Sequence, residues 1–158
     1  STKRLTHIAR DGSARMVDVS AKPITLRRAV ASAEITMNAK TLALIRRGKI
    51  PKGDVMAVAR IAGIQAAKNA ATLIPLCHPL AVESVEVKIS PRPPRALVIR
   101  VTTLIRARTG VEMEALAGAA AAALTLYDMC KAVDRGMHFE NVRLREKSGG
   151  KSGSWQAA

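Results

Sequence analysis

Two strand-like segments, residues 82–90 and 96–106, restrict the folds open to this chain more than any other part of it. In the first segment Val85, Val87 and Ile89 alternate with polar residues, which is the two-residue period of a strand with one wet face. Three prolines separate the segments and favour a hairpin or meander. Strands with one polar face need helices on their other face only, which predicts an antiparallel sheet covered on one side.

Three helices and one further strand are expected around this hairpin. Apolar residues at helical spacing follow the cap candidates Asn38 and Asp54, and Pro75 stops the second of these helices. We interpret residues 1–158 as one two-layer α+β domain. The expected elements are an irregular lead-in over residues 1–23 with an extended piece at 14–19, helices at 41–45, 55–74 and 110–133, and a strand at 137–145.

Composition places the chain among soluble single-domain proteins. Its 158 residues and 48% hydrophobic content suffice for one sizeable core. The longest uncharged apolar stretch, residues 115–127, is far shorter than the roughly 20 residues that span a bilayer. No hydrophobic signal region is evident, so a cytoplasmic protein without a membrane partner is expected. Cys77 and Cys130 have no disulfide-like or metal-binding spacing, which predicts two reduced thiols.

The net charge of +14 predicts an anionic partner, either a nucleic acid, a membrane surface or a phosphorylated small molecule. Only Tyr127, Phe139 and Trp155 are aromatic, so the chain lacks the rings on which single-stranded bases stack. The basic residues are also spread along the sequence. We therefore expect no nucleic-acid partner, and a basic phosphate- or RNA-binding module without catalysis is the alternative to an enzyme.

An acid and a base stand together at the end of the last helix. Asp128 and Lys131 are three residues apart and share one helical face. The segment 147–153 follows with two lysines, Lys147 and Lys151, and with glycines whose amides can surround an anion. A ligand site for phosphate is one interpretation, and an ordinary surface pair followed by a frayed basic tail is the other.

Lys52 lies in a loop just before a helix N-terminus, where backbone amides already favour anions. Phosphate binding is one interpretation of Lys52, and a solvated loop lysine is the other. Cys77 and His78 follow the proline that ends a long helix. The side chains of adjacent residues rarely both reach one metal ion, so a histidine that contacts substrate is favoured over a zinc ligand. A histidine that is hydrogen-bonded within a turn is the alternative.

Glu112 and Glu114 open the alanine-rich helix, where the helix dipole favours carboxylates. They lie about 200° apart on a helix, so one can bind a ligand while the other pairs with a lysine. Glu114 and Asp128 are about 21 Å apart along one helix at ~1.5 Å per residue, and cannot share a small ligand within one subunit. An antiparallel contact between two subunits would bring the N-terminal end of this helix in one chain to its C-terminal end in the other. The small residues 118–123 make such a close helix contact feasible, and tight packing on the chain's own sheet is their alternative role.

Several segments, in this order, resemble the cyclic pyranopterin monophosphate synthase family of molybdenum cofactor biosynthesis. The resemblance covers nearly the whole chain, with residues 106–108 as a departure, because Arg106-Ala107-Arg108 stands where a Gly-Lys pair is usual. The lost glycine restricts this loop, so specific contacts from it are not carried over. The matching segments are residues 5–8, 16–22, 52–55, 59–68, 73–80, 109–116, 127–133 and 147–153.

The resemblance implies a ferredoxin-like α+β fold and a homohexamer built as a trimer of dimers, with its active site at a subunit interface. It implies a lyase that converts a cyclised dihydroguanosine triphosphate to cyclic pyranopterin monophosphate and pyrophosphate, without a metal or organic cofactor. The ends, residues 1–13 and 148–158, are expected to be flexible without substrate. A regulatory domain that binds a guanine nucleotide without turnover is a further alternative.

The resemblance also implies the roles of individual residues. Asp128 matches the catalytic aspartate, and Lys52 and Lys131 match lysines of the chemistry. Pairing with Asp128 would keep Lys131 charged, whereas burial would lower its pKa. The positions expected to bind substrate are Leu76, Cys77, His78, Met113 and Glu114, with Lys147 on phosphate and Glu112, Lys22 and Arg27 in the same pocket.

Overall fold

The strand β1 (Thr25–Thr36) is the centre of a five-stranded sheet in which every neighbouring pair is antiparallel. The strand order is β2-β3-β1-β4-β5. The computed structural model describes residues 5–158, so residues 1–4 of the predicted flexible segment 1–13 lie outside the described residues. The other elements are α1 (Ala39–Arg46), α2 (Val55–Lys68), α3 (Ala70–Leu73), β2 (Ser84–Arg92), β3 (Ala96–Ala107), α4 (Glu112–Cys130), β4 (His138–Ser148) and β5 (Trp155–Gln156).

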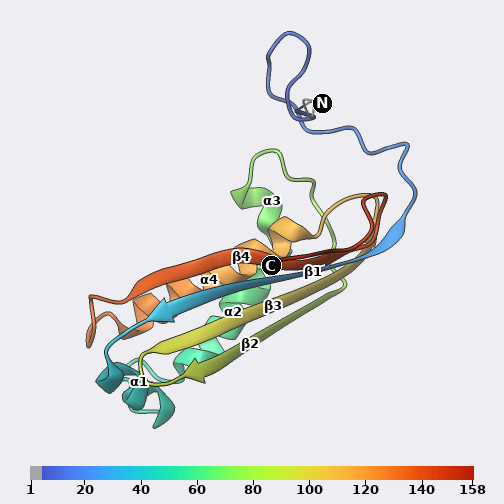
Figure 1. Cartoon of the computed structure of the whole chain (residues 1–158). Coiled ribbons are helices and arrows are strands. Elements are labelled where there is room, and N and C mark those ends of the chain that lie inside the picture. The colour runs from blue at the N-terminus through green and yellow to red at the C-terminus, as the bar shows by residue number, and fades with distance from the viewer. Residues whose placement is uncertain (1–4) are drawn as a thin grey trace.

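The helices α2 and α4 lie side by side on one face of the sheet (Figure 1). Each helix connects two strands that follow each other in sequence but are not adjacent in the sheet, as in the β-α-β-β-α-β arrangement of ferredoxin-like folds. The predicted two-layer α+β sandwich with helices on one face is confirmed. The predicted hairpin is also confirmed, because β2 and β3 pair from Ser84↔Leu104 to Arg92↔Ala96.

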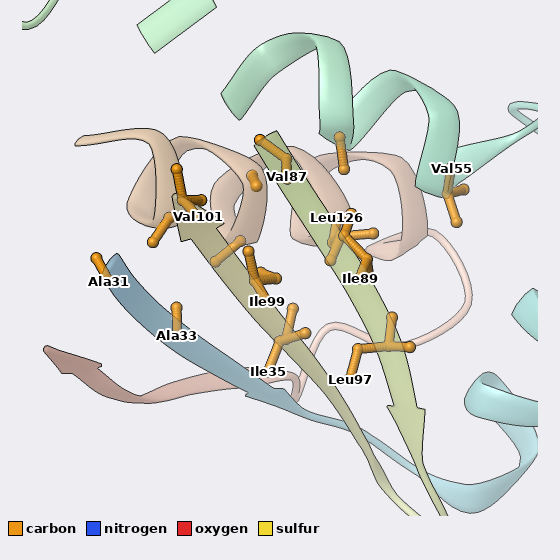
Figure 2. Close-up of a cluster of buried hydrophobic side chains, with 14 of the residues drawn as sticks. Ala31, Ala33, Ile35, Val55, Val87, Ile89, Leu97, Ile99, Val101 and Leu126 are labelled. Carbon is orange, nitrogen blue, oxygen red and sulfur yellow. The ribbon is translucent and has the colours of Figure 1, made fainter. Parts of the chain in front are cut away.

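Alternate residues of β1, β2 and β3 point into the core between the two layers. Ile35 of β1 and Ile99 of β3 are fully buried there beside Leu126 of α4 (Figure 2). On β2, Val87 and Ile89 are buried while the polar residues between them are exposed, as the alternation predicted. Removing this apolar surface from water at about 25 cal/mol per Å² is the main source of stability.

The uncovered face of the sheet carries charge pairs in place of a second helical layer. Arg28 and Arg100 both donate to Glu146, at 2.7 and 2.6 Å. Arg92 pairs with Glu34, whose side chain is nearly buried although no helix covers it. The long apolar stems of these arginines cover this face. Their charged ends pair with glutamates, so part of the large positive charge already has partners within the chain.

The sequence interpretation missed β1 and placed one helix boundary wrongly. No strand was assigned to residues 24–37, because β1 is rich in alanine and has no clear alternation; burial on both faces holds it extended. The long helix expected up to Pro75 ends at Lys68, where Asn69 caps it, and a short α3 follows. The extended piece at 14–19 forms only a bridge between Ile8 and Ala14.

The two helices approach closely where glycines face each other. A Cβ added to Gly118 would lie 3.0 Å from the carbonyl oxygen of Gly63 and 3.1 Å from Val101. A Cβ on Gly63 would lie 3.1 Å from the carbonyl oxygen of Gly118. The small residues of 118–123 therefore pack mainly within their own chain, with Gly118, Ala119, Ala122 and Ala123 buried.

We predict that Gly118→Val destabilises the fold by about 1–3 kcal/mol, because the added methyl groups overpack the contact with Gly63. Chemical denaturation monitored by circular dichroism measures this change. Ala121→Val, at a partly exposed position of the same helix, is the control and should cost well under half as much. Equal destabilisation by both variants would contradict close packing as the cause.

Candidate active site

Asp128 joins two lysines at the C-terminal end of α4. Lys131 Nζ lies 2.8 Å from Asp128 Oδ1, and Lys52 Nζ lies 3.5 Å from Oδ2 and donates to the Asp128 backbone carbonyl at 3.0 Å. The hydrogen bond from Lys131 is the main cause that lowers the pKa of Asp128, and the same bond raises the pKa of Lys131. Pairing thus outweighs burial at Lys131, and within the single chain this group is charged and open to solvent.

Local backbone geometry brings Lys52 to this position. Asp54 accepts a hydrogen bond from the Ala57 amide at 3.0 Å and so caps α2. Gly53, with φ of +104°, reverses the chain just before that cap, in a conformation that residues with a side chain rarely adopt. The lysine therefore extends from a fixed turn toward the end of α4.

A cavity of about 490 Å³ lies at the opposite, N-terminal end of α4. Its wall is formed by the start of α4 and by the loop between α3 and β2. Six of the residues predicted to bind substrate line it: Leu76, Cys77, His78, Glu112, Met113 and Glu114. The structure thus brings together residues about 35 positions apart in the sequence, as the resemblance implied.

His78 has a defined hydrogen bond. Its Nε2 lies 2.6 Å from the carbonyl oxygen of Val17, and because a carbonyl only accepts, Nε2 must carry the hydrogen. In the neutral imidazole the Nδ1 atom is then an acceptor. This hydrogen bond joins two residues that are 61 positions apart in the sequence. His78 therefore anchors the N-terminal segment and does not close a local turn.

The two glutamates at the start of α4 differ in their surroundings. Glu112 forms an ion pair with Lys147. Glu114 is 2% exposed, and neither carboxylate oxygen has a hydrogen-bond partner among the described residues. Burial raises the pKa of Glu114 above its ordinary value. One glutamate thus pairs with a lysine, as expected, and binding of a ligand by the other stays a prediction.

A second cavity, of about 740 Å³, adjoins the first and is rich in cations. Arg27, 7% exposed, donates from Nε to the Ala107 carbonyl at 3.0 Å and from Nη2 to the Arg108 carbonyl at 2.9 Å. The departing segment 106–108 therefore holds Arg27 through its backbone. The cavity is lined by Lys22, Pro23, Thr25, Arg27, Thr109, Gly110, Glu112, Lys147, Gly150, Lys151 and Ser152.

Two glycines shape the wall of this cationic cavity. A Cβ on Gly149 would lie 2.1 Å from the Leu26 carbonyl oxygen, and one on Gly150 would lie 2.5 Å from an Arg27 nitrogen. Both have positive φ, at +96° and +76°. Only glycine therefore lets the chain after Lys147 pass this close to β1 and to Arg27.

The predicted residues fall into two groups at opposite ends of one helix. The two cavities share Thr109, Gly110 and Glu112 and together contain every predicted substrate-binding residue. The predicted catalytic residues, Asp128, Lys131 and Lys52, form the other group. Fourteen residues of α4 separate Glu114 from Asp128, or about 21 Å along the helix.

Some lining residues were not singled out from the sequence. His7 and Thr109 belong to matched segments but were given no role, and Thr25 lies in the strand that was not predicted. No group of three or more potential metal ligands occurs among residues 5–158. Cys130 is buried, which raises its pKa to about 11, and burial also raises the pKa of Cys77. Neither thiol is therefore an activated nucleophile.

The fold and the site define an α+β protein with a cavity lined by cationic side chains and a separate acid and lysine group. The MoaC family model matches residues 16–150, and the chain belongs to the MoaC family. Cyclic pyranopterin monophosphate synthase 1 of Mycobacterium tuberculosis (strain ATCC 25618 / H37Rv) is 57% identical over 152 residues, covering 96% of this chain and 89% of that protein. Cyclic pyranopterin monophosphate synthase 3 of Mycobacterium bovis is also 57% identical, covering 96% of this chain and 86% of that protein.

No helix within residues 5–158 has the length and apolar character that crossing a membrane requires.

We predict that Gly149→Ala weakens binding of inorganic pyrophosphate at least about tenfold, because the added methyl group would displace the segment that carries Lys147 and Lys151. Gly153→Ala is the matched control: its φ is also positive, at +68°, but its Cβ would meet nothing within 4 Å. Isothermal titration calorimetry measures both affinities. Equal losses would show that backbone strain alone, and not the position of this wall, governs anion binding.

Proposed function

We propose that this chain is a cyclic pyranopterin monophosphate synthase. It converts (8S)-3',8-cyclo-7,8-dihydroguanosine 5'-triphosphate to cyclic pyranopterin monophosphate and releases pyrophosphate, in the cytoplasm. The printed names of the relatives, at 57% identity over 96% of the chain, support this activity. The observation that carries it is that one chain holds both an acid and lysine group and a pair of adjoining cavities, one of them lined by cationic side chains.

The proposed reaction makes two demands on a protein. It opens a purine ring and moves protons, which requires groups that donate and accept them. It also closes a cyclic phosphate diester and expels pyrophosphate, which requires cations on the phosphate oxygens. The cavity at the start of α4 accepts the heterocycle, while Arg27, Lys147 and Lys22 hold the triphosphate.

Lys131 and Lys52 shuttle protons in this proposal, and Asp128 orients them. Asp128 contacts both amines, so it fixes their positions relative to each other. Its charge also keeps the pKa of Lys131 high in the isolated chain. Enclosure by substrate and a second subunit would remove water from this pair and bring the lysine closer to a pKa useful for proton transfer.

The site is completed between copies of the chain. The distance of about 21 Å along α4 prevents one small ligand from touching Asp128 and Glu114 of the same chain. A second copy in antiparallel orientation brings its own Asp128 group to this cavity. Exposed apolar residues on α2 and α4, including Ile61 at 63% and Leu124 at 59%, suit a contact between copies. The proposed assembly is a homohexamer, a trimer of dimers.

Conversion of the cyclised dihydroguanosine triphosphate, followed by released pyrophosphate and oxidised pterin fluorescence, tests the activity. We predict that Asp128→Ala and Lys52→Ala each lower kcat by at least about a hundredfold, because each removes part of the proton-transfer group. Lys88→Ala, which removes an exposed lysine of β2 that pairs with Glu86, is the control and should keep normal turnover.

Three results would each contradict a part of this proposal. Lack of turnover by well-folded wild type that still binds pyrophosphate would indicate a phosphate-binding module without catalysis. Near-normal turnover by Lys131→Ala would exclude the proposed proton shuttle. A binding module for RNA would show affinity that falls steeply with salt and does not depend on Asp128.

Mixing two inactive variants tests the shared site. Asp128→Ala and Lys147→Ala, co-expressed with different tags, should each be inactive alone but recover about a quarter of wild-type activity together, because half of the random dimers are mixed and each has one intact site. Sedimentation of the purified complex gives its oligomeric state. Failure to recover activity in confirmed mixed oligomers would place Asp128 and Lys147 in the same site of a single chain.

A further inference from the structure

We propose that Asp134 is a positioning residue, which holds the segment that carries Lys131 and the segment that carries Lys52 in a fixed relation to each other. The Asp134 residue is 6% exposed, so it acts through these segments and not by touching substrate. The inference rests on the proposed function for the chemistry of the two lysines. The connection between their segments is a property of the chain itself.

The carboxylate of Asp134 joins parts of the chain that are far apart in the sequence. Its Oδ2 atom accepts hydrogen bonds from the backbone amide of Asn38 at 2.8 Å and from the hydroxyl of Thr41 at 2.9 Å. Its Oδ1 atom accepts a hydrogen bond from the Gly136 amide at 3.2 Å. One buried side chain thus ties the turn after α4 to the start of α1, 96 positions away.

The start of α1 takes its capping acceptor from Asp134. Asn38 is the N-cap residue by position, but within residues 5–158 its side chain makes no capping hydrogen bond. An N-cap side chain normally supplies an oxygen to the first amides of its helix. Here that oxygen comes from the other end of the domain's sequence, so the position of α1 depends on where Asp134 lies.

A tight turn connects Asp134 to the end of α4. The Asp134 amide donates to the carbonyl of Cys130 at 3.1 Å, and the Lys131 amide donates to the carbonyl of Tyr127 at 2.8 Å. The hydroxyl of Tyr127 also donates to the Arg135 carbonyl at 3.1 Å. These bonds fix the Asp134 carboxylate relative to Lys131, three residues earlier in the chain.

The other side of the connection runs through α1 to Lys52. Leu42 and Ile45 of α1 and Ile50 of the following loop are buried in the same core. The Gly53 amide donates to the Ile50 carbonyl at 3.1 Å, which closes the turn that contains Lys52. Because α1 and this loop pack as neighbours on the core, a shift of α1 moves the loop and the lysine with it.

Electrostatic effects place Asp134 and Lys52 near the same group. Burial raises the pKa of Asp134, but its hydrogen bonds and the charge of Arg95 together lower it by more, so the carboxylate is ionised. Burial is also the main cause that raises the pKa of Cys130; the charge of Asp134 raises it further, and the charge of Lys52 lowers it. Both charges therefore lie close to one buried thiol, as a bridge between the two segments requires.

Turnover of the cyclised dihydroguanosine triphosphate, measured per folded chain, tests the role in catalysis. Asp134→Ala should lower kcat about tenfold to a hundredfold, because small displacements of catalytic groups are costly. KM should stay within about threefold of wild type, since the cavities proposed to hold substrate lie at the other end of α4. Glu34→Ala, which removes another carboxylate of 6% exposure, is the matched control and should keep normal kcat. Equal loss of kcat in both variants would show general destabilisation and overturn the inference.

Two milder variants separate hydrogen bonding from charge. Asp134→Asn keeps an oxygen that accepts from Asn38 and Thr41, so it should recover kcat to within about fivefold of wild type. Thr41→Val removes one of these bonds and should lower kcat about threefold to tenfold. Its effect should not add to that of Asp134→Ala, because both changes break the same contact. Additive losses, or a loss in Asp134→Asn equal to that in Asp134→Ala, would contradict positioning through these bonds.

Nuclear magnetic resonance of protein isotope-labelled at the lysine ε-carbons tests the positioning without any need for turnover. In Asp134→Ala the Lys52 signal should move toward that of freely solvated lysines, because Lys52 loses its fixed contact with Asp128. The signal of Lys88 on β2 should stay in place. An unchanged Lys52 signal in the folded variant would overturn the inference. A shifted signal in a protein whose wild type lacks turnover would contradict the proposed function and still support the positioning by Asp134.

Discussion

The rigid helix α4 determines where each functional group of this protein can act. Its first turn carries Glu112 and Glu114 against the cavities, and its last turn carries Asp128 beside Lys131. Close packing of Gly118 on Gly63 of α2 fixes the helix on the sheet, so the two ends cannot bend toward each other. The separation of the two groups is thus a property of the fold, and the proposed shared site follows from it.

The charges of the chain are divided among distinct tasks. Arginines on the open face of the sheet pair with Glu34 and Glu146 and cover strands that no helix protects. Arg27 is held by backbone carbonyls and stays available to an anion in the cationic cavity. The net charge of +14 is therefore not evidence of a nucleic-acid surface on its own, since separate parts of it pair on the sheet and line the cationic cavity.

Much of the fold and the grouping of the site could be predicted from the sequence, for identifiable physical reasons. The alternation around Val87 and the cap at Asp54 are local signals, and the structure contains the corresponding strand and helix. β1 gave no such signal, because its alanines are held extended by burial between β3 and β4 and not by their own propensity. The isolation of Glu114 could not be predicted either, since it depends on what Leu80 and Gly110 bring around the carboxylate in three dimensions.

A crystal structure of the Asp128→Ala variant with the cyclised dihydroguanosine triphosphate bound would test the central claim most directly, which is that one site is made from opposite ends of α4 in two copies. One ligand is expected to contact Lys131 of one copy and both Glu114 and Lys147 of another. The triphosphate should lie by Gly150 and the heterocycle by His78. A ligand held entirely by residues of a single chain would contradict it.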